Sequence, residues 1–341
     1  MTNEKIAIRC ITDEKKGFGN LNRSIILASY LRLKDKKIIF LINNSPTAII
    51  QLKKLNFKFI LLPKNLKISK ESIFINEFLS SLEIQFIIID MREFSEILSK
   101  KLKKYNYKIL ILDDAWCKNI YADILINSTP ILQYHKYKQI NKNCKLFLGP
   151  KFWIIQKNFR KYIKPISEIK SKKKYNVVIT MGGSDPNNIT RKILESLKYI
   201  ENINLTILFG PFFEKNKIEE IKNIYPNLKF YHNPNNPLVI FKKSDMVITS
   251  GGNTLFELAI LGIPTICIPI IKHQIPYSKF FENLGFSINL GKWNTKKSSI
   301  LKENLISILK NIQTRKNMSR IGRKFSDGNG GFRISRIIDE C

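Results

Sequence analysis

The sequence predicts an α/β protein of two domains, each a parallel sheet flanked by helices. The first observation is the chain length of 341 residues, which is more than one small core requires. The second is the repeated alternation of short β-branched runs with longer amphipathic stretches. Strands that are buried on both faces and separated by helices are typical of doubly wound sheets. The third is that each half opens with a strand followed by a glycine-containing turn.

The first half, residues 1–159, is expected to form the N-terminal domain. Helical spacing of apolar residues predicts helices at Leu21–Leu33 and Pro46–Leu55. Short runs rich in isoleucine, leucine and phenylalanine predict strands at Ile6–Cys10, Lys37–Ile42, Phe57–Leu62, Phe86–Asp90, Ile109–Asp113 and Ile124–Asn127.

The second half, residues 175–341, is expected to form the C-terminal domain. The lysine-rich residues 160–174 show little periodicity and are predicted to connect the two domains. The tail Lys302–Ile338 is predicted to be helical with a break at Asp327–Gly331, and its packing back on the N-terminal domain stays open. Strands are expected at Tyr175–Thr180, Leu205–Phe209, Leu228–Tyr231, Met246–Thr249 and Thr265–Pro269. Two similar halves indicate two Rossmann-like domains that face one central cleft.

The chain is strongly basic, with a formal net charge of +31 from 58 Lys and Arg against 27 Asp and Glu. Nucleic-acid binding, attachment to an anionic membrane surface and a compositional bias of the genome could each produce such a charge. The lysines are spread along the whole chain, which favours the compositional bias. We therefore expect no nucleic-acid partner, while weak association with an anionic membrane surface stays open.

The cysteines and histidines predict a reducing compartment and no metal. The five cysteines form no C-x-x-C pair, and Cys10 and Cys267 lie in apolar runs that are typical of core residues. The three histidines show no metal-ligand spacing. No leader-like segment precedes the first strand, and no apolar run approaches the length of a membrane span. We expect a cytoplasmic protein, or one peripheral to the inner membrane, without a cofactor.

The segment Thr249–Thr254 is the first candidate binding turn, because it lies between a buried strand and the start of a helix. A helix N-terminus presents free N–H groups to an anion, and glycine lets phosphate oxygens approach the backbone. Glu257 follows one turn later and could accept both hydroxyls of a ribose. A turn that merely joins strand to helix, with a solvated glutamate, is the alternative. The residues that would contact the ligand are Ser250, Gly251, Gly252 and Asn253.

A second glycine turn, residues 179–186, is predicted to stand beside the first at the carboxyl ends of the sheet. Gly182, Gly183 and Ser184 follow a strand directly, and Pro186 is expected near the first position of the next helix. Taken alone, this turn is equally typical of an ordinary capped connection. Two such turns in one domain favour a cradle for a diphosphate.

In the first domain, the residues after the first strand lie where open α/β sheets place ligands. Gly17, Gly19 and Arg23 flank Asn20, which could cap the helix or contact a substrate. Asp90 and Asp113 each end a strand, so each could orient a sugar hydroxyl, act as a general base or cap the next helix.

With these segments in view, the chain resembles the GT-B nucleotide-sugar enzymes of the MurG-like group. It is most similar to the UDP-sugar hydrolase of pseudaminic acid biosynthesis and to spore-coat-polysaccharide relatives. The resemblance runs in order through Arg9, Gly17–Gly19, Arg23, Ile87–Asp90, Leu112–Asp114, Ala122–Asn127, Met181–Asp185, Ser250–Gly252 and Glu257–Ala259.

The resemblance implies that the second domain binds a UDP-sugar and that no metal is required. Gly251, Gly252 and Asn253 would hold the diphosphate and Glu257 the ribose, while Gly17, Gly19 and Asn20 would approach the transferred sugar. One departure matters: the group has histidine directly after the Gly-x-Gly, where this chain has Asn20. An amide cannot take up a proton at neutral pH.

The prediction is therefore a UDP-sugar-dependent, glycosyltransferase-like enzyme of surface glycan biosynthesis that cleaves the bond between sugar and diphosphate. Either Asp90 or Asp113 would supply the base, or the chain is a transferase whose acceptor is activated differently; the acceptor is a sugar or water. The alternatives are a UDP-sugar hydrolase of the pseudaminic acid type and a non-catalytic nucleotide-sugar binding protein.

Overall fold

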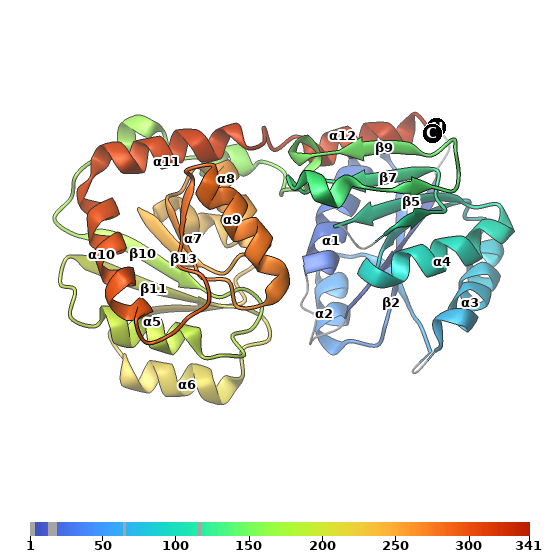
Figure 1. The fold of residues 1–341 in the computed structure, drawn as a ribbon. Helices are drawn as coiled ribbons and strands as arrows, with labels where there is room; N and C mark the ends of the chain where they lie inside the picture. Colours follow the sequence, from blue (N-terminus) through green and yellow to red (C-terminus); the bar gives the residue numbers. More distant parts are fainter. Residues whose placement is uncertain (1–3, 13–18, 64–65, 115–116) are drawn as a thin grey trace. The chain divides into compact units, whose positions relative to one another are not determined.

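The computed structural model describes residues 4–12, 19–63, 66–114 and 117–341, and within these ranges the chain divides into two compact units. Unit 1 comprises Met1–Lys157 together with Gly328–Cys341, and unit 2 comprises Asn158–Asp327. Residues 160–174, expected to be a connection, cluster with unit 2, and the last helix clusters with unit 1 (Figure 1).

Unit 1 contains a seven-stranded parallel sheet in the order β3-β2-β1-β4-β5-β7-β9. The chain reverses its direction of winding between β1 and β4, where Cys10 pairs with Asp90. A small pair, β6 with β8, lies outside this sheet. The elements are β1 Lys5–Cys10, α1 Gly19–Leu31, β2 Lys37–Ile42, α2 Pro46–Lys54, β3 Lys58–Leu61, α3 Ile68–Ser81, β4 Phe86–Asp90, α4 Ser95–Leu102, β5 Lys108–Asp113, β6 Asn119–Ile120, β7 Ile124–Asn127, β8 Lys138–Gln139, β9 Lys145–Leu148 and α12 Gly330–Asp339.

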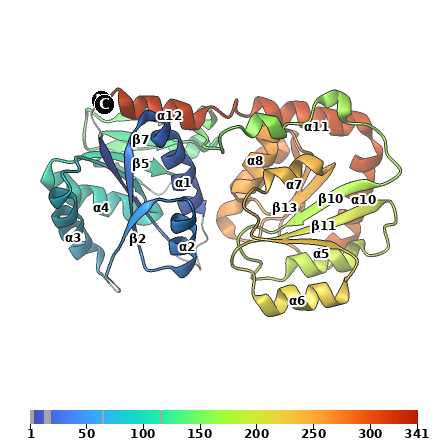
Figure 2. The ribbon, with the colours of Figure 1, turned by 180° about the vertical axis from the view of Figure 1, so that it is seen from behind.

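The helices of unit 1 cover both faces of its sheet, which is why most residues in the middle of its strands are apolar. On one face α3 and α4 pack side by side, and Ile75, Leu79 and Leu98 join alternate strand residues in one core. On the other face α1 lies beside α12 (Figure 2). Gly331 of α12 makes this contact possible, because a Cβ there would meet the Tyr30 ring at 2.3 Å.

Unit 2 contains a six-stranded parallel sheet in the order β12-β11-β10-β13-β14-β15, which is the Rossmann order. Its winding reverses between β10 and β13, where Thr180 pairs with Thr249. The elements are β10 Tyr175–Thr180, α5 Ile189–Leu197, β11 Ile203–Phe209, α6 Lys215–Ile224, β12 Lys229–His232, α7 Leu238–Lys243, β13 Met246–Thr249, α8 Asn253–Leu261, β14 Thr265–Cys267, α9 Ile275–Asn283, β15 Ser287–Asn289, α10 Lys297–Lys310 and α11 Ile312–Lys324.

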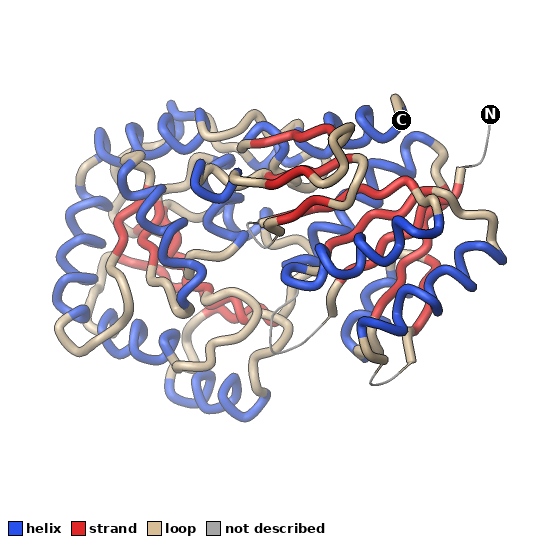
Figure 3. The backbone as a smooth tube through the Cα atoms, turned by 45° about the vertical axis from the view of Figure 1, so that its right-hand side comes forward, coloured by secondary structure: helices blue, strands red, loops and turns tan. Residues whose placement is uncertain are grey.

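Helices flank the sheet of unit 2 (Figure 3), and two groups of buried apolar residues hold them against it. One combines strand residues with the apolar faces of α5, α6 and α10. The other includes an aromatic group in which Phe281 packs 5.1 Å from Phe256 and 5.0 Å from Phe325, measured between ring centroids. Gly262 follows the last residue of helix α8 as its C-cap, and its φ of +70° terminates the helix.

The predicted α/β class is confirmed, and the structure adds elements that periodicity did not reveal. β9 and β15 extend the two sheets at their edges, and α3 precedes β4. β15 is only three residues long and has polar residues at both ends, Ser287 and Asn289, so it forms no continuous apolar run. β9 contains the apolar run Leu146–Leu148, which sequence reasoning did not select. Helix α5 begins at Ile189 rather than at Pro186, because the residues between form turns. Cys10 and Cys267 are fully buried, as expected of core residues.

Candidate functional site

The two glycine turns of unit 2 leave the sheet from neighbouring strands. Because Thr180 of β10 pairs with Thr249 of β13, the following residues lie side by side at the carboxyl edge, as the sequence predicts. They are in contact: a Cβ added to Gly182 would lie 3.4 Å from Ser250 Oγ. This is the switch point of the sheet, where α/β proteins bind ligands.

The glycines of these turns fall into two groups. Gly182 has a φ of +82°, and a Cβ on Gly251 would lie 2.8 Å from the backbone oxygen of Gln274, so the fold itself requires glycine at both. A Cβ on Gly183 or Gly252 would meet only side chains, at 3.5 Å and 3.6 Å. The fold therefore does not require glycine at these two positions.

The two helices after the turns differ in how their N-termini are capped. The carboxylate of Asp185 accepts hydrogen bonds from the backbone N–H groups of Ile189 at 2.9 Å and Thr190 at 2.6 Å. The N-terminus of α5 is therefore already capped by a negatively charged side chain. Helix α8 begins after Gly252, and among the described residues no side chain of the N-cap position bonds to its first amides. Asn253, at the first position of α8, is exposed, and Ser184 is half-buried.

Glu257 lies one turn into α8 and is partly buried. Removal of water from its carboxylate raises the pKa of Glu257 to about 7, against a usual value of 4.5. Burial disfavours the charged form of this carboxylate. Hydrogen-bond donors such as ribose hydroxyls would stabilise that charged form.

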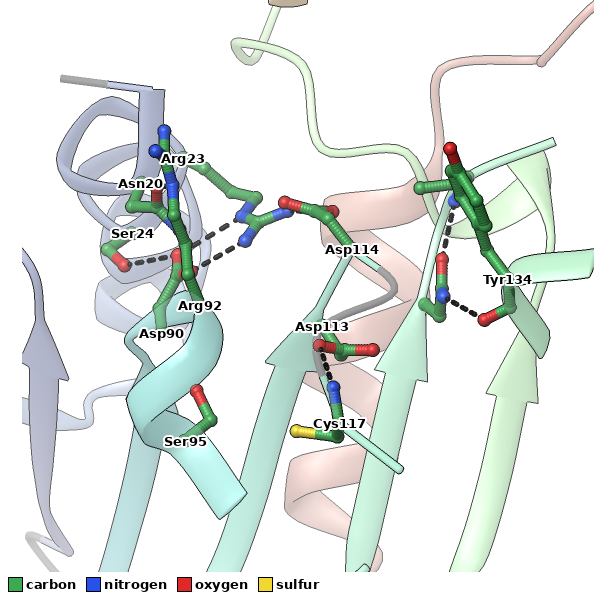
Figure 4. A network of polar contacts seen from close by, with 12 residues as sticks. Asn20, Arg23, Ser24, Asp90, Arg92, Ser95, Asp113, Asp114, Cys117 and Tyr134 are labelled. Atoms are coloured by element: carbon green, nitrogen blue, oxygen red, sulfur yellow. Dashed lines mark hydrogen bonds and ion pairs between the residues drawn. The ribbon is translucent and has the colours of Figure 1, made fainter. Parts of the chain in front are cut away.

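In unit 1 the switch point holds a buried network of polar side chains (Figure 4). The Asn20 amide donates a short hydrogen bond to Asp90 Oδ1, and its own oxygen accepts one from Arg92 Nε at 3.0 Å. Arg23 donates to Asp90 through Nη2 at 2.6 Å and Nε at 3.1 Å, and Ser24 donates to Asp90 Oδ2 at 3.1 Å. Asn20 therefore contacts a side chain rather than capping α1. Gly19 begins α1, and Gly17 lies outside the described residues.

The expected role of Asp90 as a general base does not fit this geometry. Asp90 is fully buried, and its two oxygens accept four hydrogen bonds. A carboxylate has about four lone-pair positions, so none is left for a substrate. Asp90 instead fixes the positions of Asn20 and Arg23.

Asp113 also has a structural environment. It is 1% exposed, and its oxygens accept from the Cys117 backbone at 3.2 Å and from Tyr137 Oη at 2.8 Å. The Asn127 side-chain amide donates to the same Tyr137 Oη at 2.6 Å. These contacts of Asp113, Tyr137 and Asn127 fix the segments that follow β5 and β7. This geometry does not fit proton transfer by Asp113. Asp113 does not cap a helix either, because the next described element after β5 is the strand β6.

Asp114 and Arg92 are members of the network that sequence reasoning did not select. Asp114 Oδ1 accepts from Arg23 Nη1 at 2.6 Å, and its side chain is 27% exposed, so it is the open carboxylate of the group. Burial lowers the pKa of Arg23, but the carboxylates of Asp114 and Asp90 outweigh it and hold that pKa well above its usual value. Arg92 has a φ of +54°, which is uncommon for arginine. In the sequence, the two consecutive aspartates at the end of β5 were the signal that could have identified Asp114 as a candidate site residue.

A pocket of about 690 Å³ opens at the same edge of the unit 1 sheet. At its base Arg9 Nε lies 2.6 Å from Glu71 Oε1, and both side chains are buried. Arg9 also donates to the backbone oxygens of Cys10 at 2.8 Å and Leu41 at 3.3 Å, which fixes the guanidinium. The other lining residues are Ile11, Thr12, Asn43, Asn44, Ser45, Pro46, Leu66, Ile68, Met91 and Phe94.

Two Rossmann-like units, each with polar or glycine-rich turns at its switch point, define a protein of the GT-B type. The crystal structure of MurG from Acinetobacter baumannii has this fold: it superposes with a TM-score of 0.72 at 14% identity, covering 99% of this chain and 100% of that chain. The chain belongs to the family of the glycosyltransferase family 28 C-terminal domain, whose profile matches residues 158–329.

Relatives in sequence are consistent with this family. A Methanocaldococcus jannaschii protein of uncharacterized function is 30% identical over 77% of this chain and 55% of its own length. The spore coat polysaccharide biosynthesis protein SpsG of Bacillus subtilis is 24% identical over 78% and 80%. A Helicobacter pylori protein named pseudaminic acid cytidylyltransferase and UDP-2,4-diacetamido-2,4,6-trideoxy-beta-L-altropyranose hydrolase is 30% identical over 54% and 34%. The chain thus spans about half or less of two of these relatives.

In the described part of the chain, no helix is both long and apolar enough to cross a membrane.

Proposed function

We propose that this protein is a UDP-sugar-dependent glycosyltransferase of surface glycan biosynthesis. Unit 2 binds the nucleotide: the turns at Gly182–Ser184 and Ser250–Asn253 hold the diphosphate, and Glu257 binds the ribose. The pair of glycine turns at one switch point, with the uncapped N-terminus of α8, carries this assignment. The names of the relatives in spore coat polysaccharide and pseudaminic acid synthesis support the type of pathway.

In the proposed reaction, unit 1 supplies the base and binds the acceptor. An acceptor hydroxyl attacks the anomeric carbon and loses its proton to Asp114, while the bond between that carbon and the diphosphate oxygen breaks and UDP leaves. Asp114 suits this role because its second oxygen, Oδ2, has no partner among the described residues. Asn20, Asp90 and Arg23 hold it in position. Backbone amides at the start of α8 stabilise the charge on the departing diphosphate.

The pocket of unit 1 supports an acceptor with both polar and apolar groups. Half of its lining residues are apolar, and the others offer amide, hydroxyl and charged groups. Its volume of about 690 Å³ lies within the range of small-molecule sites. An acylated or deoxy sugar combines hydroxyls with methyl groups and matches this lining.

A UDP-sugar hydrolase is the second candidate, supported by the name of the Helicobacter pylori relative. Asn20 weighs against it, because the amide between Asp90 and Arg92 cannot accept a proton from water.

The test measures UDP release from UDP-N-acetylhexosamines and UDP-hexoses, with and without a panel of monosaccharide and lipid-linked acceptors. A transferase releases UDP only with an acceptor, and a hydrolase releases it in either case. UDP binding, measured by calorimetry, without release under any condition would refute catalysis and leave a binding protein.

A further inference from the structure

The ion pair at the base of the unit 1 pocket has two polar atoms without a partner. Arg9 donates through Nε to Glu71 Oε1 and through Nη1 to the backbone oxygens of Cys10 and Leu41. Among the described residues, Arg9 Nη2 donates to no partner and Glu71 Oε2 accepts from none. The pair therefore has one donor and one acceptor that the fold does not use.

These two atoms face the pocket. Arg9 is 1% exposed and Glu71 is 4% exposed, so protein encloses almost all of both residues. Neither Arg9 Nη2 nor Glu71 Oε2 belongs to the unpaired polar atoms of the described chain that are closed off from solvent. Both atoms thus keep contact with open space, and the pocket of about 690 Å³ is the space that the two residues line.

Both side chains are fixed before a ligand binds. Arg9 lies in the inner strand β1, and Glu71 lies in the first turn of α3. The contact of 2.6 Å between Arg9 Nε and Glu71 Oε1 joins the strand to the helix. Because the free donor and the free acceptor stand at set positions, a ligand that uses them has little side-chain ordering to bring about.

The two charges of the pair cancel, which decides the class of ligand. Arg9 and Glu71 are the only charged residues among those that line the pocket in the described chain. A ligand carboxylate would be repelled by Glu71, and a ligand ammonium group would be repelled by Arg9. Either ion would lose its hydration for little net attraction. A neutral group with one acceptor and one donor uses both free atoms without that cost.

The rest of the lining supplies apolar contacts, from Ile11, Pro46, Leu66, Ile68, Met91 and Phe94. A hydroxyl group alone would leave this surface uncovered, whereas a methyl group beside the polar contacts would bury part of it. A secondary amide that ends in a methyl group combines a carbonyl oxygen, an N–H group and an apolar end. We propose that the pocket recognises the acetamido group of an N-acetylated sugar. Its carbonyl oxygen accepts from Arg9 Nη2, and its N–H donates to Glu71 Oε2.

The direct test measures the binding of N-acetylglucosamine and of glucose to the full chain by saturation-transfer NMR, without any UDP-sugar. We expect the acetyl methyl protons to receive the strongest saturation. N-acetylglucosamine should bind at least about tenfold more tightly than glucose, because glucose cannot make the two amide hydrogen bonds to the charged pair. Equal affinities, or no binding of N-acetylglucosamine, would overturn the proposal.

Paired variants assign this preference to the ion pair. Arg9→Leu combined with Glu71→Leu removes both free atoms and leaves no buried charge without its partner. We expect this variant to bind the two sugars with equal affinity. Arg336→Leu combined with Glu340→Leu removes an exposed ion pair of α12 and should retain the tenfold preference. The same preference in the pocket variant would contradict the assignment.

A crystal of the full chain soaked in N-acetylglucosamine needs no variant to fold. We expect the acetamido oxygen within hydrogen-bond distance of Arg9 Nη2. A sugar bound with this group turned toward the exposed Asn43 or Asn44 would overturn the proposal.

The inference rests on the proposed function only in taking the N-acetylated sugar to be the acceptor, and the two can fail separately. Acceptor-dependent release of UDP without binding of N-acetylglucosamine in this pocket would keep the transferase and refute the acetamido site. Binding in the pocket without release of UDP under any condition would keep the acetamido site and refute the transferase.

Discussion

The Asn20 side-chain amide donates a hydrogen bond to the buried carboxylate of Asp90, so the two residues that flank the switch point of unit 1 form one rigid group. This contact uses Asp90 for positioning rather than for proton transfer. It also places an amide where the related hydrolases are expected to carry a histidine. The open carboxylate of the group is Asp114, joined to Asp90 through Arg23.

The first prediction concerns Asp114 as the base. Asp114→Asn should lower kcat by about 100-fold or more, within the usual range for loss of a general base, and leave UDP affinity unchanged. Steady-state kinetics with calorimetry of UDP binding measures both. Asp339→Asn is the matched control, because that carboxylate is 25% exposed and ion-paired with Lys34. A variant of Asp114 with full kcat would remove it from the mechanism.

The second prediction concerns Asn20. Asn20→His places an imidazole beside the Asp90 carboxylate, which can orient it and stabilise its protonated form. We expect acceptor-independent release of UDP to rise at least tenfold above the natural chain. Asn22→His, which is exposed on the same helix, should leave this rate unchanged. If neither histidine raises hydrolysis, the difference from the hydrolases lies elsewhere.

The third prediction separates glycines needed for the fold from those needed for the ligand. Gly252→Ala should fold normally, because its Cβ would meet only side-chain atoms at 3.6 Å and 3.9 Å, yet weaken UDP binding by obstructing the diphosphate. Gly251→Ala should instead lower the Tm, because its Cβ would lie 2.8 Å from a backbone oxygen. Thermal unfolding and UDP titration of both variants test this. Unchanged UDP affinity in Gly252→Ala would refute binding of the diphosphate at this turn.

The fourth prediction concerns pH. Because the pKa of Glu257 is raised to about 7, the folded chain holds a proton that the unfolded chain loses near pH 4.5. This contribution to stability is therefore lost as the pH rises from about 4.5 to 7. Glu257→Gln should raise the Tm at pH 8 relative to the natural chain, with less effect at pH 4.

Ligand binding should show the opposite dependence on pH. Ribose hydroxyls donate to the carboxylate, so UDP affinity should increase as the pH rises through about 7. Glu257→Gln should lose this dependence and bind UDP about 10- to 100-fold more weakly at pH 8. Glu303→Gln, an exposed residue, is the control. A pH profile of UDP binding that is flat in the natural chain would contradict the ribose assignment.

The fifth prediction concerns the ion pair beneath the pocket of unit 1. Arg9→Leu should destabilise the protein by about 3–5 kcal/mol, because Glu71 would be left buried and unpaired. The double variant with Glu71→Leu should recover most of the loss. Urea unfolding measures both free energies. Equal losses in the single and double variants would mean that the pair contributes packing rather than charge compensation.

The sequence alone determined the fold class, most of the inner strands and the two glycine turns of unit 2. These features are local, because β-branched runs, turn glycines and helix starts follow from the preferences of neighbouring residues. The edge strand β15 was missed because its three residues form no apolar run, and the start of α5 was misplaced because turns separate it from Pro186. The edge strand β9 was missed although it contains the apolar run Leu146–Leu148.

Only the tertiary structure decided what the acidic residues do. Asp90, Asp113 and Asp114 each end or follow a strand, and their sequence contexts look alike. Their roles differ because donors from distant segments fill the oxygens of Asp90 and Asp113 but leave Asp114 partly open. Hydrogen-bond saturation and burial depend on segments far apart in the chain, so no local pattern can reveal them.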